Sequence, residues 1–208
     1  GAGKAGTSIA RAALAAGDDV AIAASGDAER IRLIVEVLVP GAVATTAAEA
    51  VRDADLVVLA VPTHKLPSIE PGLLNGRIVV DVTNYWEPID GRIEELEHAT
   101  AGTSVLVQQR FPAARIVKSL NHLGYHELEE DARPAGAPNR RAVAAASDDT
   151  GAKDVVLDFI DRIGFDPVDA GPLARGVALQ PGSPVFGAAH PRAAFEAVLA
   201  GGRPEVAA

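Results

Sequence analysis

The chain opens with Gly1-Ala2-Gly3-Lys4-Ala5-Gly6, whose glycine spacing is its strongest indication of a fold. The stretch fits G-x-G-x-x-G, the turn from a strand into a helix that receives a dinucleotide pyrophosphate. The first glycine allows the tight bend, the second lets the backbone approach the phosphates, and the third lets the helix pack on the sheet. Because this motif should follow a strand, we expect that the native protein has one before Gly1, and that the chain folds poorly without it.

Strands and helices alternate along the rest of the chain, and this alternation is typical of a parallel α/β sheet. Short buried strands are expected at residues 20–23, 43–45, 56–61, 78–82, 115–120, 142–146 and 164–169. Helices are expected at residues 4–16, 27–38 with Asp27 as N-cap, 47–53, 154–163 and 192–199. The pattern predicts a Rossmann-type α/β fold with a doubly wound parallel sheet. We expect the dinucleotide-binding domain at residues 1–146 and a continuous βα extension at residues 147–208.

Composition excludes several classes of function. The chain has 208 residues, a formal charge of −9 and no basic run, which argues against a nucleic-acid-binding face. It has no cysteine, so disulfides, thiol catalysis and cysteine-ligated metals are excluded. Its longest apolar runs are far too short to cross a bilayer. We expect a cytoplasmic protein that acts on a small molecule.

The glycine motif has two rival interpretations. A glycine-rich surface turn that binds nothing would look the same, but the helix and strand that follow at the expected spacing favour dinucleotide binding. A phosphate-binding P-loop would also place glycines at positions 1 and 6, but Thr7 then stands where lysine is required. We reject the P-loop, because its lysine neutralises the terminal phosphates.

The end of the second strand selects the cofactor. An acid there would accept from the ribose 2′-hydroxyl of NAD, but the chain has Ala23, Ala24 and Ser25, with no acid before Asp27. Ser25 can donate to a 2′-phosphate and Arg30 can neutralise it, which favours NADP(H). The alternative is that Ser25 is an ordinary turn residue and Arg30 a solvated one.

Three further stretches resemble a known family: residues 81–84 (DVTN), 117–121 (VKSLN) and 164–173 (GFDPVDAGPL). With the opening glycines they are similar to the coenzyme F420-dependent NADP oxidoreductases, from Gly1 to about Gly187. The resemblance implies a Rossmann domain with a small C-terminal lobe, hydride exchange between NADP(H) and the deazaflavin F420, and a homodimer.

The resemblance also implies roles for individual residues. It places Ala2 to Ala5 on the pyrophosphate, and Ser25 and Arg30 on the 2′-phosphate, although Gly26 replaces an arginine of the family pattern. The segment after the fourth strand, Val61, Pro62 and Thr63, would lie along the cofactor ribose. Thr83, Asn84 and Asn121 would flank the nicotinamide, where strands end at the ligand-binding edge of an open sheet.

Hydride transfer between stacked rings needs few protein acids or bases, so the lack of a catalytic triad does not argue against an enzyme. Tyr85 and Trp86 are candidates for a flat wall beside the acceptor; the alternative is edge packing. His122 is a candidate proton donor to a reducible ring. His64 is read as a loop residue near the cofactor.

The spacing of His122 and His126 would also allow a metal site on a helix, but a solvated acidic helix is favoured and no metal is expected. Besides F420, we consider two alternatives. One is an NADPH reductase of a flavin, quinone, imine or carbonyl, and the other is an NADP-binding redox sensor without turnover.

Overall fold

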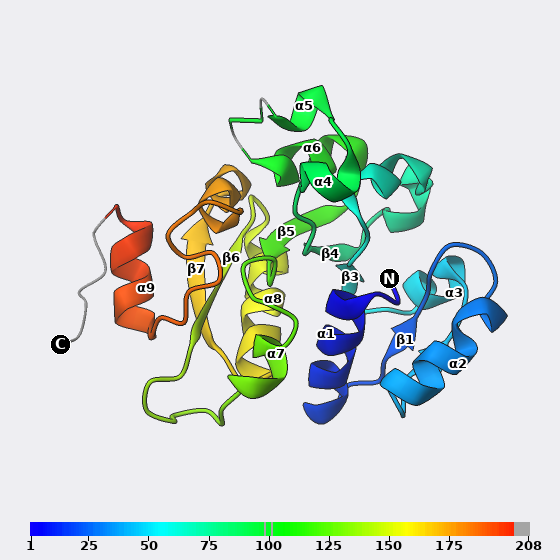
Figure 1. Ribbon diagram of the computed structural model, residues 1–208, viewed down its shortest axis with the longest axis horizontal. Coiled ribbons are helices and arrows are strands. Elements are labelled where there is room, and N and C mark those ends of the chain that lie inside the picture. The colour runs from blue at the N-terminus through cyan, green and yellow to red at the C-terminus, as the bar shows by residue number, and fades with distance from the viewer. Residues whose placement is uncertain (98, 101, 202–208) are drawn as a thin grey trace.

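The computed structural model describes residues 1–97, 99–100 and 102–201 (Figure 1). Within these residues, seven strands form two sheets, in the orders β1-β2 and β3-β4-β5-β6-β7. The strands are β1 (Ala21–Ile22), β2 (Val43–Ala44), β3 (Val57–Leu59), β4 (Ile78–Asp81), β5 (Arg115–Ser119), β6 (Ala142–Ala146) and β7 (Asp166–Gly171). All seven coincide with expected strands, and the prediction of a Rossmann-like α/β fold is confirmed.

The direction of β6 differs from the prediction of a parallel sheet. β3, β4 and β5 run parallel, but β6 pairs antiparallel with β5, and β7 then pairs parallel with β6. A buried strand such as β6, with all five residues buried, looks the same in sequence whichever way it runs. The sheet is therefore mostly parallel, with one reversal at the junction to the C-terminal part.

One face of the five-stranded sheet is covered by α1 (Lys4–Ala15) and α8 (Thr150–Arg162). Ile9 and Ala13 of α1 and Val156 and Ile160 of α8 share a core with strand residues such as Val117. Residues one turn apart thus form a single apolar stripe on each helix. This face holds the amino-terminal end of α1, and with it the glycine loop, beside the strands.

The opposite face is covered by segments with less regular structure. α3 (Ala47–Arg52), α6 (Thr103–Arg110) and the 3₁₀ helices η1 (Thr63–Ser68), η2 (Pro71–Leu74) and η3 (Leu173–Leu179) contribute to this layer. α9 (Arg192–Leu199) packs farther along, over β6 and β7, through Phe195 and Val198. The sheet is thus the middle layer of three, and adjacent residues such as Val79 and Val80 are both fully buried because they face opposite layers.

Two of the described helices begin at a side-chain cap. Thr46 and Glu49 form a reciprocal capping box at α3, and the Asp149 side chain accepts from the Ala152 N–H at the start of α8. The expected Asp27 cap is wrong. α2 (Glu29–Leu38) has Ala28 at its N-cap position and no side-chain cap, and Asp27 lies one residue too early.

Three short helices complete the described fold: α4 (Glu87–Asp90), α5 (Glu94–Glu97) and α7 (Glu127–Glu130). The division at residue 146 stays a prediction, and residues 202–208 of its second part lie outside the described residues. Among the described helices, none has the length and apolar composition needed to span a lipid bilayer.

Candidate functional site

The glycine loop packs against the end of β3, and two of its glycines leave no room for a side chain. A Cβ on Gly1 would lie 1.9 Å from the Ala60 carbonyl oxygen, and one on Gly6 would lie 2.0 Å from the Gly1 carbonyl oxygen. A Cβ on Gly3 would instead have no protein atom within 4 Å. The backbone at Gly3 therefore faces open space, as the pyrophosphate interpretation requires.

Gly3 is also the N-cap of α1, with extended backbone and no side-chain cap. The first N–H groups of a helix have no partner within the helix. The first turn of α1 carries no acidic residue, so nothing there repels an anion. The open backbone and the positive end of the helix dipole together form a place that can accept a diphosphate.

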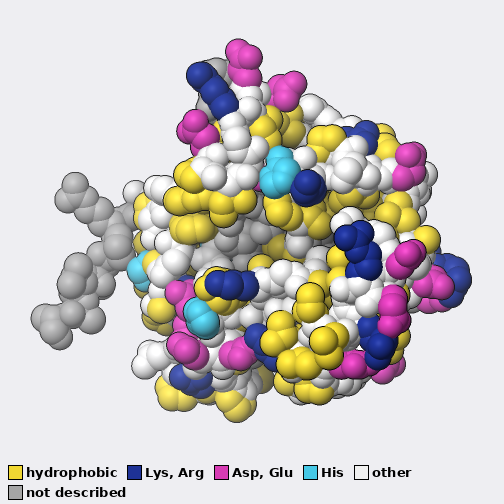
Figure 2. Space-filling model, turned by 45° about the vertical axis from the view of Figure 1, so that its right-hand side comes forward, with side chains coloured by type: hydrophobic (Ala, Val, Ile, Leu, Met, Phe, Trp, Pro, Cys, Tyr) yellow, Lys and Arg dark blue, Asp and Glu magenta, His cyan; other side chains and the backbone are white. Residues whose placement is uncertain are grey.

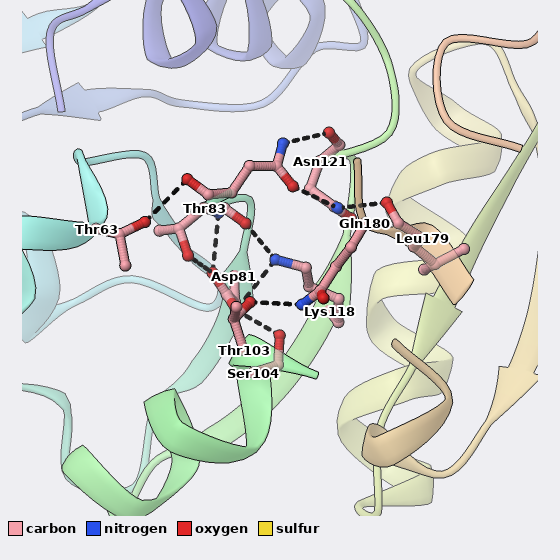
Figure 3. A network of polar contacts seen from close by, with 10 residues as sticks. Thr63, Asp81, Thr83, Thr103, Ser104, Lys118, Asn121, Leu179 and Gln180 are labelled. Carbon is pink, nitrogen blue, oxygen red and sulfur yellow. Dashed lines mark hydrogen bonds and ion pairs between the residues drawn. The ribbon is translucent and has the colours of Figure 1, made fainter. Parts of the chain in front are cut away.

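The carboxyl ends of β3, β4 and β5 meet at the same edge of the sheet and are joined by side-chain hydrogen bonds (Figure 3). Thr63 Oγ1 donates to the Asn84 carbonyl at 2.9 Å. Asn84 and Asn121 pair reciprocally: Asn84 Nδ2 donates to the Asn121 carbonyl at 2.7 Å, and Asn121 Nδ2 donates to Asn84 Oδ1 at 2.9 Å. The structure thus brings together four of the predicted cofactor residues, Thr63, Thr83, Asn84 and Asn121.

Asn121 is held by a further bond and by unusual backbone. Its Nδ2 also donates to the Leu179 carbonyl at 2.7 Å, which ties β5 to η3. The preceding Leu120 has a φ of 60°, a left-handed conformation that is unfavourable for a bulky residue. Among the described residues, Asn121 Oδ1 is buried without a hydrogen-bond partner. A ligand N–H at this position would satisfy it.

A cavity of about 110 Å³ lies between the glycine loop and this strand edge. Its lining residues come from α1, the segments after β4 and β5, and α7: Ala5, Ile9, Val82, Asn84, Leu120, Asn121, Leu123, Gly124, Tyr125 and Leu128. The space-filling view shows a hollowed face with hydrophobic side chains around the hollow (Figure 2). A mostly apolar cavity with two amides on its wall suits a flat ring that carries a polar substituent.

The contact between Lys4 and Tyr125 was not predicted from the sequence. Lys4 Nζ lies 3.3 Å from the Tyr125 hydroxyl and 5.1 Å from the centre of its ring. Tyr125 thereby joins the glycine loop to the far wall of the cavity. The available signal was that Tyr125 is one of two tyrosines in a chain with 4% aromatic residues, six positions after the end of β5 at the ligand-binding edge.

Ser25 and Arg30 lie together at the exposed turn after β1. A Cβ on Gly26 would lie 3.3 Å from Nη1 of Arg30, so the guanidinium lies over this turn. No ion pair of Arg30 is found within the described part of the chain, whereas Arg32 on the same helix pairs with Glu29 and Glu36. The guanidinium is thus free to meet an anion beside Ser25.

Tyr85 and Trp86 take different positions after β4. The Tyr85 hydroxyl donates to the Gly91 carbonyl and accepts from the Ile93 N–H, so it fixes the loop before α5. Trp86 is 52% exposed. Only Trp86 has a large free surface with which a second ring could stack, and both assignments stay predictions.

His64 and Asp90 form a structural pair in the same neighbourhood. The Asp90 carboxylate accepts from the backbone N–H groups of His64 and Trp86 and contacts His64 Nδ1 at 2.9 Å. Burial raises the pKa of Asp90, but these hydrogen bonds outweigh it and the pKa is lowered overall. The pair joins η1 to α4 at the rim of the site.

His122 is not placed to donate a proton to a substrate. Its side chain is only 2% exposed, packs against the Phe195 ring and has Nε2 3.3 Å from the Ala144 N–H. Burial, followed by the charges of Arg141 and Lys118, lowers its pKa to about 3. His122 also does not line the cavity. His122 therefore packs behind the cavity, and its position gives the candidate catalytic role no support.

The alternative of two histidines on one helix is not found, and the acidic segment that was favoured forms α7. His122 and His126 do not share a helix, because α7 begins only at Glu127. Within the described residues, no group of three or more metal-ligating side chains is close enough to hold a metal.

Comparison with known proteins gives a partial family match. The family described as "NADP oxidoreductase coenzyme F420-dependent" matches residues 1–85, which hold the glycine loop, the Ser25–Arg30 turn and the end of β4. A comparison with curated proteins gives no match to the chain.

Solved structures give matches over most of the chain. A hypothetical protein from Sinorhizobium meliloti is 25% identical with a TM-score of 0.76, covering 91% of this chain and 92% of the other. A protein of Arthrobacter sp. FB24, provisionally assigned as an F420-dependent NADP reductase, is 25% identical with a TM-score of 0.69, covering 85% and 86%.

More distant matches share the fold alone. A pyrroline-5-carboxylate reductase from Coxiella burnetii is 18% identical with a TM-score of 0.51, and the match covers 81% of this chain and 56% of that one. The match over residues 1–85 and the likeness to the Arthrobacter protein confirm the resemblance to coenzyme F420-dependent NADP oxidoreductases and, at the level of enzyme class, the prediction of an NADP-dependent oxidoreductase.

Proposed function

We propose that the chain transfers a hydride between NADPH and a deazaflavin of the coenzyme F420 type. One observation carries the proposal: the cavity lined by the paired amides of Asn84 and Asn121 is also lined by Ala5, two residues after the open backbone at Gly3. A dinucleotide with its diphosphate on the start of α1 would direct its nicotinamide toward this pair. The unpartnered Asn121 Oδ1 would accept from the nicotinamide carboxamide.

The cofactor carries the redox chemistry, and the protein sets distance, orientation and exclusion of water. Gly3 and Lys4 would hold the diphosphate, Val61 and Pro62 the ribose, and Asn84 with Asn121 the nicotinamide. Ser25 and Arg30 would hold the 2′-phosphate and so select NADPH over NADH. The acceptor ring would approach from the exposed side, where Trp86 lies. The homodimer and cytoplasmic location expected from sequence are parts of the same proposal.

A second candidate is direct reduction of an imine or a carbonyl. The Tyr125 hydroxyl supports it, because this group lies on the cavity wall beside Lys4 and could give a proton to the nitrogen or oxygen of the substrate. A Tyr125→Phe variant would then lose most of its rate with such a substrate while binding NADPH normally.

The test has two stages. Fluorescence titration with NADPH and NADH comes first, and tighter binding of NADPH is expected. NADPH oxidation is then followed with F420, a flavin, a quinone, an imine and a carbonyl compound. If F420 is the only one of these acceptors that oxidises NADPH, the proposal is supported. Oxidation by an imine or a carbonyl compound supports the second candidate. Tight NADPH binding without oxidation by any acceptor would point to a redox sensor and reject both.

A further inference from the structure

Directly beneath the paired amides lies an ion pair that is closed to solvent. Asp81 ends β4, Lys118 lies on β5, and both side chains are 0% exposed. Lys118 Nζ lies 3.4 Å from Asp81 Oδ2. Burying two charges costs desolvation energy, and a well-packed apolar pair often serves stability equally well. Stability alone therefore does not explain the pair. The residues that its hydrogen bonds hold in place are more informative.

Both charged groups hold Thr83, the residue before Asn84 (Figure 3). Asp81 Oδ1 accepts from the Thr83 N–H at 2.9 Å and from its Oγ1 at 2.7 Å. Lys118 Nζ donates to the Thr83 carbonyl. The N–H, hydroxyl and carbonyl of Thr83 are thus all held by the ion pair, so the backbone that carries Asn84 is fixed on both sides.

The pair also connects to the layers on either side. Ser104 Oγ of α6 donates to Asp81 Oδ2 at 2.5 Å. Gly176 of η3 lies against the Lys118 stem, where a Cβ would be 3.0 Å from Cγ. Next to it, Gln180 Nε2 donates to Thr103 Oγ1 at 2.7 Å (Figure 3). The conformation of the β4 end is therefore coupled to α6 and to the C-terminal segment.

We propose that Asp81 and Lys118 are positioning residues, which hold the Asn84–Asn121 pair at the distance and angle that hydride transfer requires. Neither side chain touches the cavity, so neither is catalytic. Lys118 Nζ acts through the Thr83 carbonyl, and Asp81 acts through the Thr83 N–H and hydroxyl. This inference rests on the proposed function for its kinetic test, but its structural test is independent of activity.

The main variant is Lys118→Met, which keeps the length of the stem and removes the charge. We expect kcat at saturating NADPH to fall about 10- to 100-fold, because small misplacement of reacting groups costs that much. The affinity for 2′,5′-ADP, which probes only the adenosine half of the site, should be unchanged. The primary isotope effect with deuterated NADPH should rise, since the chemical step becomes more limiting.

Arg140→Met is the matched control. Arg140 is also buried, at 3% exposed, and pairs with Asp161 and Asp166 instead of residues of this network. It should lose comparable stability and retain kcat. Should Lys118→Met fail to fold, Ser104→Ala removes only one bond to Asp81. Its control is Ser147→Ala, which removes a buried bond to the Ile116 carbonyl and the bond that Ser147 Oγ accepts from the Asp149 N–H.

Hydrogen–deuterium exchange gives the readout that does not need turnover. In Lys118→Met or Ser104→Ala, exchange should rise at residues 82–85 and 120–122 and not in the matching control. Unchanged exchange there would overturn the inference, as would equal losses of kcat in variant and control. A wild-type protein that oxidises no NADPH would reject the proposed function, while exchange at these two segments would still decide the positioning role.

Discussion

The two ends of the candidate cofactor site are built in opposite ways. At the nicotinamide end, Thr63, Thr83 and Asn121 are nearly inaccessible to solvent and joined by hydrogen bonds. At the 2′-phosphate end, Ser25 and Arg30 are exposed, on a turn beside the two-stranded sheet β1-β2. Hydride transfer depends on geometry, which buried contacts hold well, whereas recognition of a phosphate depends mainly on charge.

The contrast predicts how each end responds to change. Substitutions at the buried end should alter stability and kcat together, with little dependence on salt. Those at the exposed turn should alter the preference for NADPH over NADH, and salt should weaken the effect because exposed charges are screened.

The glycine loop, between the two ends, should show the largest effect. In Gly6→Ala, the new Cβ would lie 2.0 Å from the Gly1 carbonyl oxygen, so the loop must move. We expect a loss of unfolding free energy of about 1–3 kcal/mol, as for other overpacked sites, and no measurable NADPH binding. Thermal unfolding and fluorescence titration measure the two quantities.

Gly3→Ala is its matched partner, because the Cβ there meets no protein atom. This variant should keep the melting temperature of the wild type. Its affinity for NADPH should still fall, since the methyl group would take the space of the phosphates. Normal affinity in Gly3→Ala would place the diphosphate elsewhere.

The closed character of the nicotinamide end can be tested through His122 and pH. Its pKa is about 3 in the folded protein, mainly through burial, against an ordinary value of 6.5. Between these values the unfolded chain binds more protons, so stability falls as the pH is lowered from 6.5 toward 3. The loss is about 2 kcal/mol by pH 5, and nothing is lost above pH 7.

Urea unfolding at pH 7 and pH 5 measures this loss. His122→Gln, which cannot take up the proton, should have a smaller loss between the two values. Equal pH dependence in wild type and variant would mean that solvent reaches this part of the molecule.

At the exposed end, Arg30→Ala should raise the dissociation constant for NADPH about tenfold, or about 1.4 kcal/mol, and leave that for NADH unchanged. Added salt should reduce the difference. Arg32→Ala is the control, because Arg32 is paired with Glu29 and Glu36 on the same helix. Equal losses for both cofactors would rule out Arg30 as the phosphate partner.

Trp86→Ala should have the smallest effect on the protein itself. Because Trp86 is 52% exposed, the unfolding free energy should change by no more than about 0.5 kcal/mol. If Trp86 stacks on the acceptor, KM for F420 rises while the dissociation constant of NADPH stays the same. An unchanged KM for F420 would mean that Trp86 does not contact the acceptor and only packs at the surface.

Much of the fold could be predicted because its signals are local. The apolar run from Leu56 and the glycine at position 17 mark a strand and a helix end through nearby residues alone. The direction of β6 could not be predicted, since a fully buried strand has the same apolar sequence pattern whether it runs parallel or antiparallel to its neighbour. The N-cap at α2 was wrong because Asp27 suits such a position chemically but lies one residue outside it.

The candidate site was predictable only in part, because some of its contacts join residues that are far apart in the sequence. The positions of Thr83, Asn84 and Asn121 follow from the rule that ligands bind at strand ends. The burial of His122 depends on Phe195, which is 73 positions away, and the Lys4–Tyr125 contact joins residues 121 positions apart. The sequence around each of these residues gives no sign of its distant partner, so both contacts could be found only from the structure.

The most direct test of the central claim is a crystal structure of the protein with NADP⁺. We expect diphosphate oxygens within hydrogen-bond distance of backbone N–H groups at the start of α1, and a nicotinamide carboxamide bonded to Asn121. A diphosphate bound elsewhere, or a nicotinamide away from the Asn84–Asn121 pair, would contradict it.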